Sequence, residues 1–528
     1  MELGEHVGYV VATDQTPTFS RMHIYLIPGK IVYPGELLAV LLEGNRKTVV
    51  FVRVVEGMFI DRYQKPHMVH LHELMGTKSI SAELDRLPGK FAMVEAEVLE
   101  EAEEPEYRPH EPKSLVPPGS PVYRVNSDLA AKILGLPSEG EKGLSVGYLV
   151  GPGNAEVILD PERVLPRHIL IVGSTGTGKT WLRGVLAEEL HRLGIPQVHV
   201  DVHGEFVKAT EELGGRNMTP GKDLTVRLSS LSELDVLELI PYLTELQAEI
   251  VRRAFLDLKA EKEGLGSNAS QVRASITMDR YIESADKGAN PELIRFFALI
   301  EKAAKLMRSR DETREMALAR AAMLKSVKII GPGVDWEQLI NESSVINIDC
   351  RFLSATELYA VVGAVARELL EMRMHGKGRP LVLFIDEAHL FVPHGQDTPS
   401  SFVLRELIRY GRHYGIGLVL ITPSPTDIDQ RLVRMTNTRF IFAIEPDQLK
   451  SLHGVFADAP EDLISKLPKL EVGTCLLTGS RETVRHAVLI RVKSERKTTH
   501  GGETPKFLDQ FHRGRKTWKG EKDLIEES

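Results

Sequence analysis

Apolar positions follow two different periods along this chain. From about Gly151, short apolar runs of strand length alternate with amphipathic runs of helical length. The strand-like run HILIVG at 168–173 is followed by a glycine-rich turn and an amphipathic stretch from Thr180 to Leu193, which Gly194 and Pro196 terminate. PQVHVDV is the next strand-like run. This alternation predicts an α/β fold in which a mainly parallel sheet is covered by helices.

The N-terminal region, residues 1–100, has a different pattern. Between about Val7 and Val98, short β-rich runs such as HVGYVVAT and MHIYLIP are separated by turns. Regularly spaced short strands are typical of a small β-barrel or sandwich. The following segment, EEAEEPEYRPHEPKSLVPPGSPVYRV, is first acidic and then rich in proline, so we interpret residues 101–150 as a connector into the α/β core.

A helical period replaces the strand pattern in residues 229–325, where apolar positions lie three and four residues apart. We interpret this segment as an all-helical insertion that divides the α/β core into residues 151–228 and 326–505. The core pattern resumes with SSVINIDC, a helix to about His375, LVLFIDE and GLVLIT. Residues 506–528 are highly charged and are expected to form a C-terminal tail.

Composition narrows the function classes. The chain has 528 residues, and its formal net charge of −8 does not indicate a wholly basic nucleic-acid-binding surface, so any DNA contact would be local. Its two cysteines, Cys350 and Cys475, have no metal-ligand spacing and give no disulfide framework. We expect a cytoplasmic protein, because the sequence has neither a secretory leader nor an apolar run of about 18 residues.

A phosphate-binding loop is predicted between the first core strand and its helix. The run GSTGTGKT at 173–180 fits the Walker A pattern G-x-x-x-x-G-K-[ST], with a strand before it and a helix after it. Its backbone N–H groups would cradle the phosphates of ATP, Lys179 would reach the β and γ oxygens, and the Thr180 hydroxyl would bind Mg²⁺. The alternative is an ordinary glycine turn before a helix. The candidate nucleotide-binding residues are Gly173, Ser174, Thr175, Gly176, Thr177, Gly178, Lys179, Thr180 and Trp181.

A second candidate element is LVLFIDEAH, in which an apolar strand ends on Asp386 and Glu387. Carboxylates at the C-terminal end of a buried parallel strand lie where open α/β sheets bind ligands. Asp386 would hold Mg²⁺ and Glu387 would orient and deprotonate the attacking water as general base. The alternative is a pair of acids that complement the dipole of a helix N-terminus.

The motifs together resemble a P-loop ATPase with a RecA-like core. The letters DEAH suggest a DEAH-box helicase, but the arginine-rich late motif of that family is missing. The chain instead places an additional strand and helix, from SSVINIDC to His375, before the Asp386 strand. This order, with Glu387 directly after Asp386, resembles the FtsK-HerA superfamily, whose other members include the conjugative motors.

Within that superfamily the chain most resembles the HerA-type motors of archaea, over nearly its whole length. The resemblance rests on the Walker A neighbourhood, on DVHGEF at 201–206, on RYGRHYGIGLVLIT at 409–422 followed by NTRFIF, and on HGG from His500. Asp201, His203 and Glu205 of DVHGEF could shape the nucleotide site, or they could form a turn capped by the aspartate.

The resemblance implies a homohexameric ring that hydrolyses ATP, moves DNA through a central channel as a translocase or helicase, and works with a NurA-type nuclease in DNA end resection and double-strand break repair. We expect no membrane to be involved, because the sequence has no apolar run long enough to serve as an anchor. The resemblance also implies that an arginine reaches the γ-phosphate of the neighbouring subunit. Our candidates are Arg412 and Arg167, either of which could instead be a solvated arginine. Lys208 and the loop at 392–401 are candidates for pore contacts with DNA, and each has an equally good interpretation as plain surface.

One departure from the HerA pattern affects the step that senses the γ-phosphate. Relatives usually carry a glutamine-arginine pair after the strand GLVLIT, whereas this chain has Pro423 and Ser424. Proline has neither a side-chain amide nor a backbone N–H to offer. Thr422 could supply a hydroxyl instead. This departure leaves open a scaffold whose assembly depends on nucleotide. A second alternative, a ring ATPase that moves another cargo, is suggested by the conjugative and secretion ATPases of the same superfamily.

Overall fold

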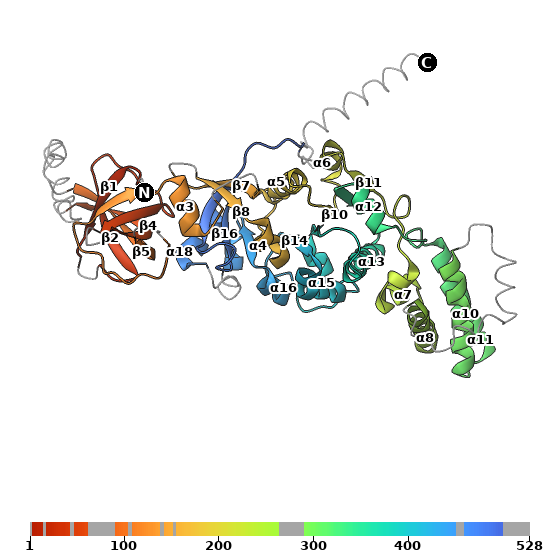
Figure 1. Ribbon diagram of the computed structural model, residues 1–528. Coiled ribbons are helices and arrows are strands. Elements are labelled where there is room, and N and C mark those ends of the chain that lie inside the picture. Colours follow the sequence, from red (N-terminus) through yellow and green to blue (C-terminus); the bar gives the residue numbers. More distant parts are fainter. Residues whose placement is uncertain are drawn as a thin grey trace, which may run out of the picture.

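Three parts follow one another along the molecule in the computed structural model (Figure 1): a barrel at one end, a large sheet with its helices in the middle, and a group of helices at the other end. The predicted charged tail, 506–528, and the HGG segment from His500 lie outside the described part of the chain. The structure describes residues 3–13, 17–42, 47–61, 90–103, 108–137, 142–151, 155–262, 290–449 and 459–499.

Six antiparallel strands close into the N-terminal barrel, in the order β1-β2-β5-β4-β3-β6, as predicted for this region. Alternate side chains such as Met22 and Ile24 of β2 point into the barrel and are fully buried. The barrel does not end at residue 100, because β6 is needed to pair with β1 and close it. The strands are β1 (His6–Val11), β2 (Arg21–Leu26), β3 (Leu37–Leu42), β4 (Thr48–Asp61), β5 (Lys90–Glu103) and β6 (Pro121–Arg124).

The segment 101–150 is more than the connector that its composition suggested. It contains the end of β5, all of β6, the helix α3 (Ser127–Leu134) and the strand β7 (Leu144–Leu149). β7 forms a hairpin with β8 (Glu156–Leu159) and pairs with β17 (Val488–Val492), so the central sheet begins before residue 151. The prolines and acidic residues of this segment indicate its loops. They do not indicate its short strands, because those strands pair with partners far away in sequence.

The central sheet has eleven strands and is mixed, so the expected mainly parallel sheet is only part of it. Its parallel part runs in the order β11-β12-β10-β13-β14-β9-β15, and the strands β16, β17, β7 and β8 then extend it by antiparallel pairing. The connections within the β16–β17 and β7–β8 pairs are too short for a crossover, so these two pairs can only be antiparallel. The remaining strands are β9 (Ile169–Val172), β10 (Gln197–Asp201), β11 (Arg216–Met218), β12 (Val345–Asp349), β13 (Leu381–Ile385), β14 (Ile416–Thr422), β15 (Thr438–Ile441) and β16 (Thr474–Gly479).

Both faces of the parallel part are covered by helices, which is why its strands are continuous apolar runs. Leu170 and Val172 of β9 pack with the core that includes α13 (Ala355–Met374) and α15 (Ser401–Tyr414). Ile169 and Ile171 point to the opposite face and pack with α5 (Lys179–Arg192). Shorter helices fill the connections: α4 (Pro161–Val164), η1 (Leu165–Arg167), α6 (Val207–Glu212), η2 (Leu228–Ser230), α12 (Trp336–Glu342), α14 (Ala388–Phe391), α16 (Gln430–Met435), η4 (Pro446–Gln448), α18 (Glu461–Ile464) and η5 (Leu467–Lys469).

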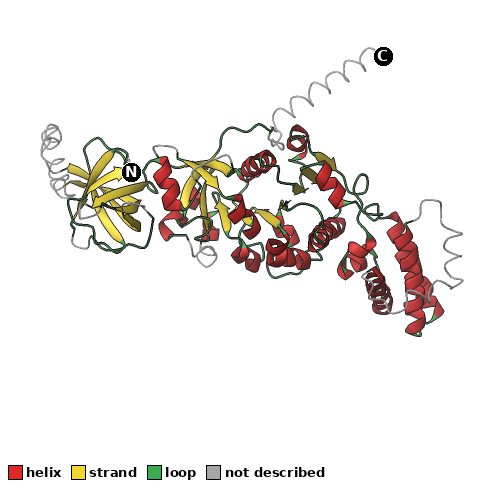
Figure 2. Ribbon diagram, in the orientation of Figure 1, coloured by secondary structure: helices red, strands yellow, loops and turns green. Residues whose placement is uncertain are grey.

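The segment predicted as a helical insertion forms the far end of the molecule, where Figure 2 shows helices in red and no strands among the described residues. Phe255 and Phe296 of two of its helices meet edge to face and are buried. Residues 263–289 lie outside the described part. The elements are α7 (Glu233–Leu239), α8 (Glu245–Lys262), α10 (Pro291–Leu306), α11 (Asp311–Ala321) and η3 (Ala322–Ser326).

Ion pairs join the barrel to the central sheet. Arg53 of β4 is 1% exposed and contacts Glu97 of β5 and Asp462 of α18, at 2.5 and 3.3 Å. Glu100 of β5 is also buried and lies within 3.5 Å of Arg485. A buried charge is tolerated only when it has partners, so these contacts hold the two parts together.

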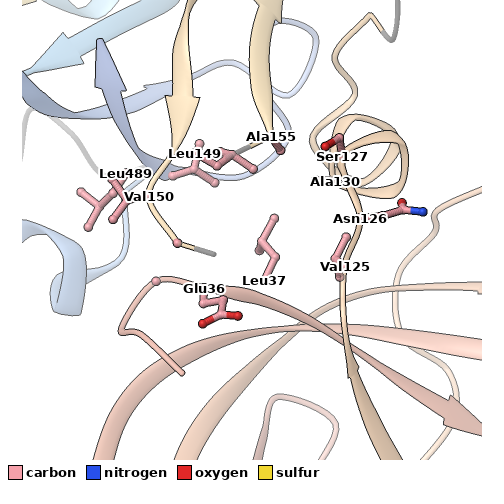
Figure 3. A pocket seen from close by; sticks show the side chains of 13 residues that line it. Glu36, Leu37, Val125, Asn126, Ser127, Ala130, Leu149, Val150, Ala155 and Leu489 are labelled. Carbon is pink, nitrogen blue, oxygen red and sulfur yellow. The ribbon is translucent and has the colours of Figure 1, made fainter. Parts of the chain in front are cut away.

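A small cavity of 210 Å³ lies at the same junction (Figure 3). Leu37, Leu149 and Leu489 bring side chains from the barrel and the sheet to its wall. The carboxylate of Glu36 also lines it and accepts hydrogen bonds from the Tyr33 backbone and the Arg124 side chain. Each carboxylate oxygen of Glu36 therefore already has a hydrogen-bond donor.

Among the described residues, no helix combines the length and the apolar character needed to cross a lipid bilayer.

Candidate nucleotide site

The glycine-rich loop connects the C-terminal end of β9 to the start of α5, as the sequence predicts. At Gly178 the backbone has φ 121°, and a Cβ there would lie 3.0 Å from the ring of Phe442, so glycine is required. The loop is held on both sides, because Ser174 N donates to Ala443 O at 2.8 Å and Gly473 N donates to Thr177 O at 2.9 Å. Its conformation is thus fixed by the neighbouring strands.

Lys179 occupies the first position of α5. Its Nζ donates to the carbonyl oxygens of Gly173 and Ser174, at 2.5 and 2.9 Å. Burial lowers the pKa of Lys179, and the nearby carboxylates of Glu387 and Asp386 oppose this shift. The ammonium group therefore lies inside the loop, in a site where an anion would stabilise its charge.

A cavity of about 650 Å³ opens above this loop. Residues of the loop, of the β13 end and of the DVHGEF turn line it together, as the common edge of parallel strands requires. Gly173, Ser174 and Thr177 shape the loop but do not line the cavity. The predicted residues that do line it are Thr175, Gly176, Gly178, Lys179, Thr180, Trp181, His203, Glu205, Asp386 and Glu387.

The two acids at the end of β13 have different surroundings. Asp386 accepts hydrogen bonds from Glu387 N and from Arg183 Nη1, both at 3.0 Å. Glu387 lies in the cavity wall, and burial and the charge of Asp386 raise its pKa, although His389, His203 and Lys179 oppose this. A raised pKa makes a carboxylate a stronger base at neutral pH.

The backbone of Glu387 lies in the left-handed region, with φ 49°, which is costly for a residue with a side chain. Glu387 is the N-cap of the short helix α14, but its side chain makes no capping hydrogen bond. Its carboxylate instead lies 3.6 Å from Nε2 of His203 and 3.3 Å from Nδ1 of His389. The geometry thus favours a role in the cavity over a role at the helix terminus.

The DVHGEF turn fits both interpretations that its sequence allows. Asp201 is fully buried and accepts hydrogen bonds from the backbone N–H groups of Glu205 and Phe206, at 3.2 and 2.9 Å. This is the capping role. His203 and Glu205 then project from the capped turn into the cavity.

The oxygen groups of Thr180 and Asp386 suit Mg²⁺, which prefers hydroxyl, carboxylate and phosphate oxygens. Both residues line the same cavity beside Lys179. The donor set therefore fits a magnesium ion bound together with nucleotide phosphates.

The strand that separates the β9 and β13 ends is β14, which follows β13 in sequence. β12, the additional strand singled out in the sequence, lies beyond β10 on the far side. Thr422 ends β14 and is fully buried, and its hydroxyl donates to Ser424 O at 3.0 Å. This hydroxyl is thus used within its own turn, and Thr422 does not line the cavity.

Both candidate arginines lie at the opposite edge of the sheet from the cavity. Arg412 is exposed near the end of α15 and lines a hollow with Leu381 and Gly417, at the start of β13 and β14. Arg167 lies just before β9 and forms an ion pair with Glu482. Neither side chain can reach the P-loop of its own chain across the length of the strands.

The residues proposed for pore contacts lie on surface elements. Lys208 is exposed on α6. The loop at 392–401 is tied down at its end, where the Ser400 and Ser401 hydroxyls donate to Phe391 O at 3.2 and 3.1 Å. Residues 394–397 form its exposed tip.

Sequence reasoning missed one wall of the cavity and one buried charge. The wall comprises Val472, Gly473 and residues 491–494, and Trp181 Nε1 donates to Lys493 O at 2.6 Å. These residues belong to the antiparallel extension and carry no motif. The buried charge is Arg183, which follows Lys179 by four residues. One indication in the sequence that Arg183 is buried is that the residue stands among apolar positions of α5.

Comparisons with known proteins found similar sequences and similar solved structures. Residues 144–369 match a protein family described as the central domain of helicase HerA. A probable helicase of Methanocaldococcus jannaschii is 25% identical over 382 residues, which cover 69% of this chain and 68% of that protein. A DNA double-strand break repair helicase HerA of Sulfolobus acidocaldarius is 24% identical over 415 residues, covering 75% and 77%. Among solved structures, VirB4 of Thermoanaerobacter pseudethanolicus aligns with 67% of this chain and 97% of its own, at 15% identity and a TM-score of 0.49.

Proposed function

We propose that this chain, whose residues 144–369 match the central domain of helicase HerA, is an ATP-dependent DNA translocase or helicase that acts in double-strand break repair. The observation that carries the proposal is the single cavity lined by Lys179, Thr180, Asp386 and Glu387. The names of its relatives, among them a DNA double-strand break repair helicase, support DNA as the partner.

Each cavity residue has a role in the proposed hydrolysis. Lys179 and the loop N–H groups bind the phosphates, and Thr180 and Asp386 hold Mg²⁺, which neutralises phosphate charge when it is bound. Glu387 accepts a proton from the attacking water, for which its half-buried carboxylate and raised pKa are suited. His203 lies beside Glu387 and can hold the carboxylate in position.

Each cavity is completed by a second subunit in the proposed assembly. Arg412 is exposed and lies at the sheet edge opposite its own P-loop, so it can stabilise γ-phosphate charge only in a neighbouring subunit. Arg167 is the second candidate, and its pair with Glu482 has to open for this role. A closed ring, which we propose to be a homohexamer, gives every cavity such a neighbour and leaves a central channel for DNA.

Mixing two inactive variants tests the role of Arg412 across subunits. We expect Arg412→Ala and Glu387→Gln each to lower ATP turnover, by about 10³-fold for the arginine. Rings that contain both variants should recover part of the turnover, because a cavity with an intact Glu387 then receives Arg412 from its neighbour. Turnover is measured across mixing ratios, with differently tagged subunits to confirm mixed rings.

Arg409→Ala is the matched control, because Arg409 is also exposed on α15 but lies one turn earlier. This variant should keep normal turnover alone. Mixed rings that show no recovery at any ratio would place Arg412 outside the neighbouring site.

The function itself is tested by ATP turnover with and without linear duplex DNA, together with the mass of the particle in solution. Stimulation by DNA in a hexamer-sized particle is the expected result. Slow ATP turnover that duplex DNA does not stimulate would favour a nucleotide-dependent scaffold or a motor for another cargo. The Pro423 and Ser424 departure and the engaged Thr422 hydroxyl are the observations that keep the scaffold as the second candidate.

The nuclease partner is a separate part of the proposal. We propose a NurA-type nuclease that uses the DNA end presented by the ring. Copurification of the two proteins and ATP-dependent resection of a duplex end would support it, and resection that is independent of the motor would contradict it.

A further inference from the structure

Arg183 contacts residues that build the nucleotide site, although it does not itself line the cavity. The side chain is 1% exposed, and it extends from α5 toward the ends of β10 and β13. Its Nη1 donates to Oδ2 of Asp386 at 3.0 Å and lies 3.7 Å from Oδ1 of Asp201. The guanidinium also stacks over the ring of Phe206, 4.6 Å from its centre.

This arrangement connects three separate elements of the site. Asp386 ends the strand that carries Glu387, whereas Asp201 caps the turn that carries His203. Arg183 touches both aspartates from the helix that begins with Lys179. A change in the charge of any one of these elements therefore alters the electrostatic energy of the other two, because the site is buried and poorly screened.

The guanidinium is not fully satisfied by its partners. Among the described residues, Nε and Nη2 of Arg183 have no hydrogen-bond acceptor. A buried arginine with two unused donor groups costs free energy, which the two carboxylates offset by their charge. The position of such a residue beside the carboxylate proposed to bind Mg²⁺ therefore points to a role that depends on its charge.

Asp386 is the carboxylate for which Arg183 and a magnesium ion would compete. Both of its oxygens are engaged, Oδ2 by Arg183 and Oδ1 by the N–H of Glu387. A positive charge 3.0 Å away reduces the attraction of the carboxylate for a second cation. The same charge also prevents Asp386 and Asp201 from repelling each other when no metal ion is bound.

We propose that Arg183 is a positioning residue that acts as the resident counter-ion of Asp386: it holds this carboxylate in place without a metal and raises the Mg²⁺ concentration that nucleotide binding requires. Mg²⁺ is therefore retained only together with the phosphates of the nucleotide, which add the negative charge that Arg183 removes. This inference rests on the proposed function, in which Asp386 binds Mg²⁺.

Neutral variants test the charge of Arg183 directly. For Arg183→Gln, and for Arg183→Met as a second neutral variant, we expect ADP binding to require roughly tenfold less Mg²⁺ than in the unchanged protein. Arg183→Lys keeps the charge and should stay near the unchanged value. Binding of ADP is measured by calorimetry on the full chain at a series of Mg²⁺ concentrations, so that the result does not depend on turnover.

Thermal stability gives a second readout that a merely packing role would not produce. Without Mg²⁺ the neutral variants should melt at lower temperature, because two buried aspartates then face each other unpaired. Addition of Mg²⁺ and ADP should raise their melting temperature more than that of the unchanged protein, since the metal replaces the missing positive charge. A neutral variant that folds only with Mg²⁺ and ADP supports the proposal for the same reason.

Arg53→Met is the matched control. Arg53 is equally buried and also pairs with two acids, Glu97 and Asp462, but it lies at the junction with the barrel. This variant should lose stability while its Mg²⁺ requirement stays unchanged.

An unchanged or increased Mg²⁺ requirement in the neutral variants, or no additional stabilisation by Mg²⁺ and ADP, would overturn the role of Arg183. The proposed function would survive that result if the unchanged protein still binds ADP with Mg²⁺. Failure of the unchanged protein to bind nucleotide would instead remove the nucleotide site itself.

Discussion

Lys179→Ala is expected to reduce ATP turnover by a factor of about 10³ and to abolish any ATP-dependent movement on DNA. The Nζ of Lys179 lies inside the glycine-rich loop, within hydrogen-bonding distance of Gly173 O and Ser174 O. Phosphate oxygens would replace these weak neutral acceptors and stabilise a charge that burial otherwise disfavours. Alanine removes this interaction in the ground state and in the transition state, so both nucleotide affinity and turnover should fall.

Turnover and nucleotide affinity of Lys179→Ala are compared with those of Lys305→Ala, which removes an exposed lysine of α10 far from the cavity. The control should behave as the unchanged protein does, and both variants should keep the same melting temperature to within a few degrees. Full ATP turnover in Lys179→Ala would contradict the assignment of residues 173–180 as a P-loop.

Glu387→Gln is expected to separate binding from hydrolysis. The amide has the shape of the carboxylate but cannot accept a proton, so turnover should fall by about 10² to 10⁴-fold while ATP binding persists. Loss of a negative charge close to Lys179 should, if anything, strengthen binding of the anionic nucleotide. Binding of ATP and single-turnover hydrolysis are measured on the same preparation.

Glu471→Gln is the control for Glu387→Gln. Glu471 is a solvent-exposed acid that does not line the cavity but pairs with Arg491, which does. The Glu471→Gln variant should hydrolyse ATP at the same rate as the unchanged protein. If Glu387→Gln hydrolyses ATP at the normal rate, the general base is a different residue, and Glu205, which lines the same cavity, becomes the next candidate.

The local motifs of the nucleotide site were predictable because each is a contiguous stretch of chain. A strand, a glycine-rich turn and a helix that begins with Lys179 can be recognised without knowledge of their neighbours. The same holds for the apolar strand that ends on Asp386. The rule that parallel strands share one edge was then enough to expect both motifs in one site.

The other half of the site could not be predicted, because its residues come together only through strand pairing. The hairpin of β16 and β17 brings Val472 and residues 491–494 to the cavity, although no pattern in these segments indicates a ligand. The position of β14 between β9 and β13 is likewise a matter of pairing, which the order of the strands along the chain does not give.

The sequence alone established the order of the parts: an N-terminal barrel, an α/β core with a P-loop, and a helical insertion. It did so because hydrophobic period and turn residues are local properties of the chain. The three-dimensional fold was needed to establish that β6 closes the barrel and that the central sheet is mixed, since those pairings join segments far apart in sequence. It also decided that Arg183 is buried between two aspartates, because the cost of burying a charge depends on partners that three different elements supply.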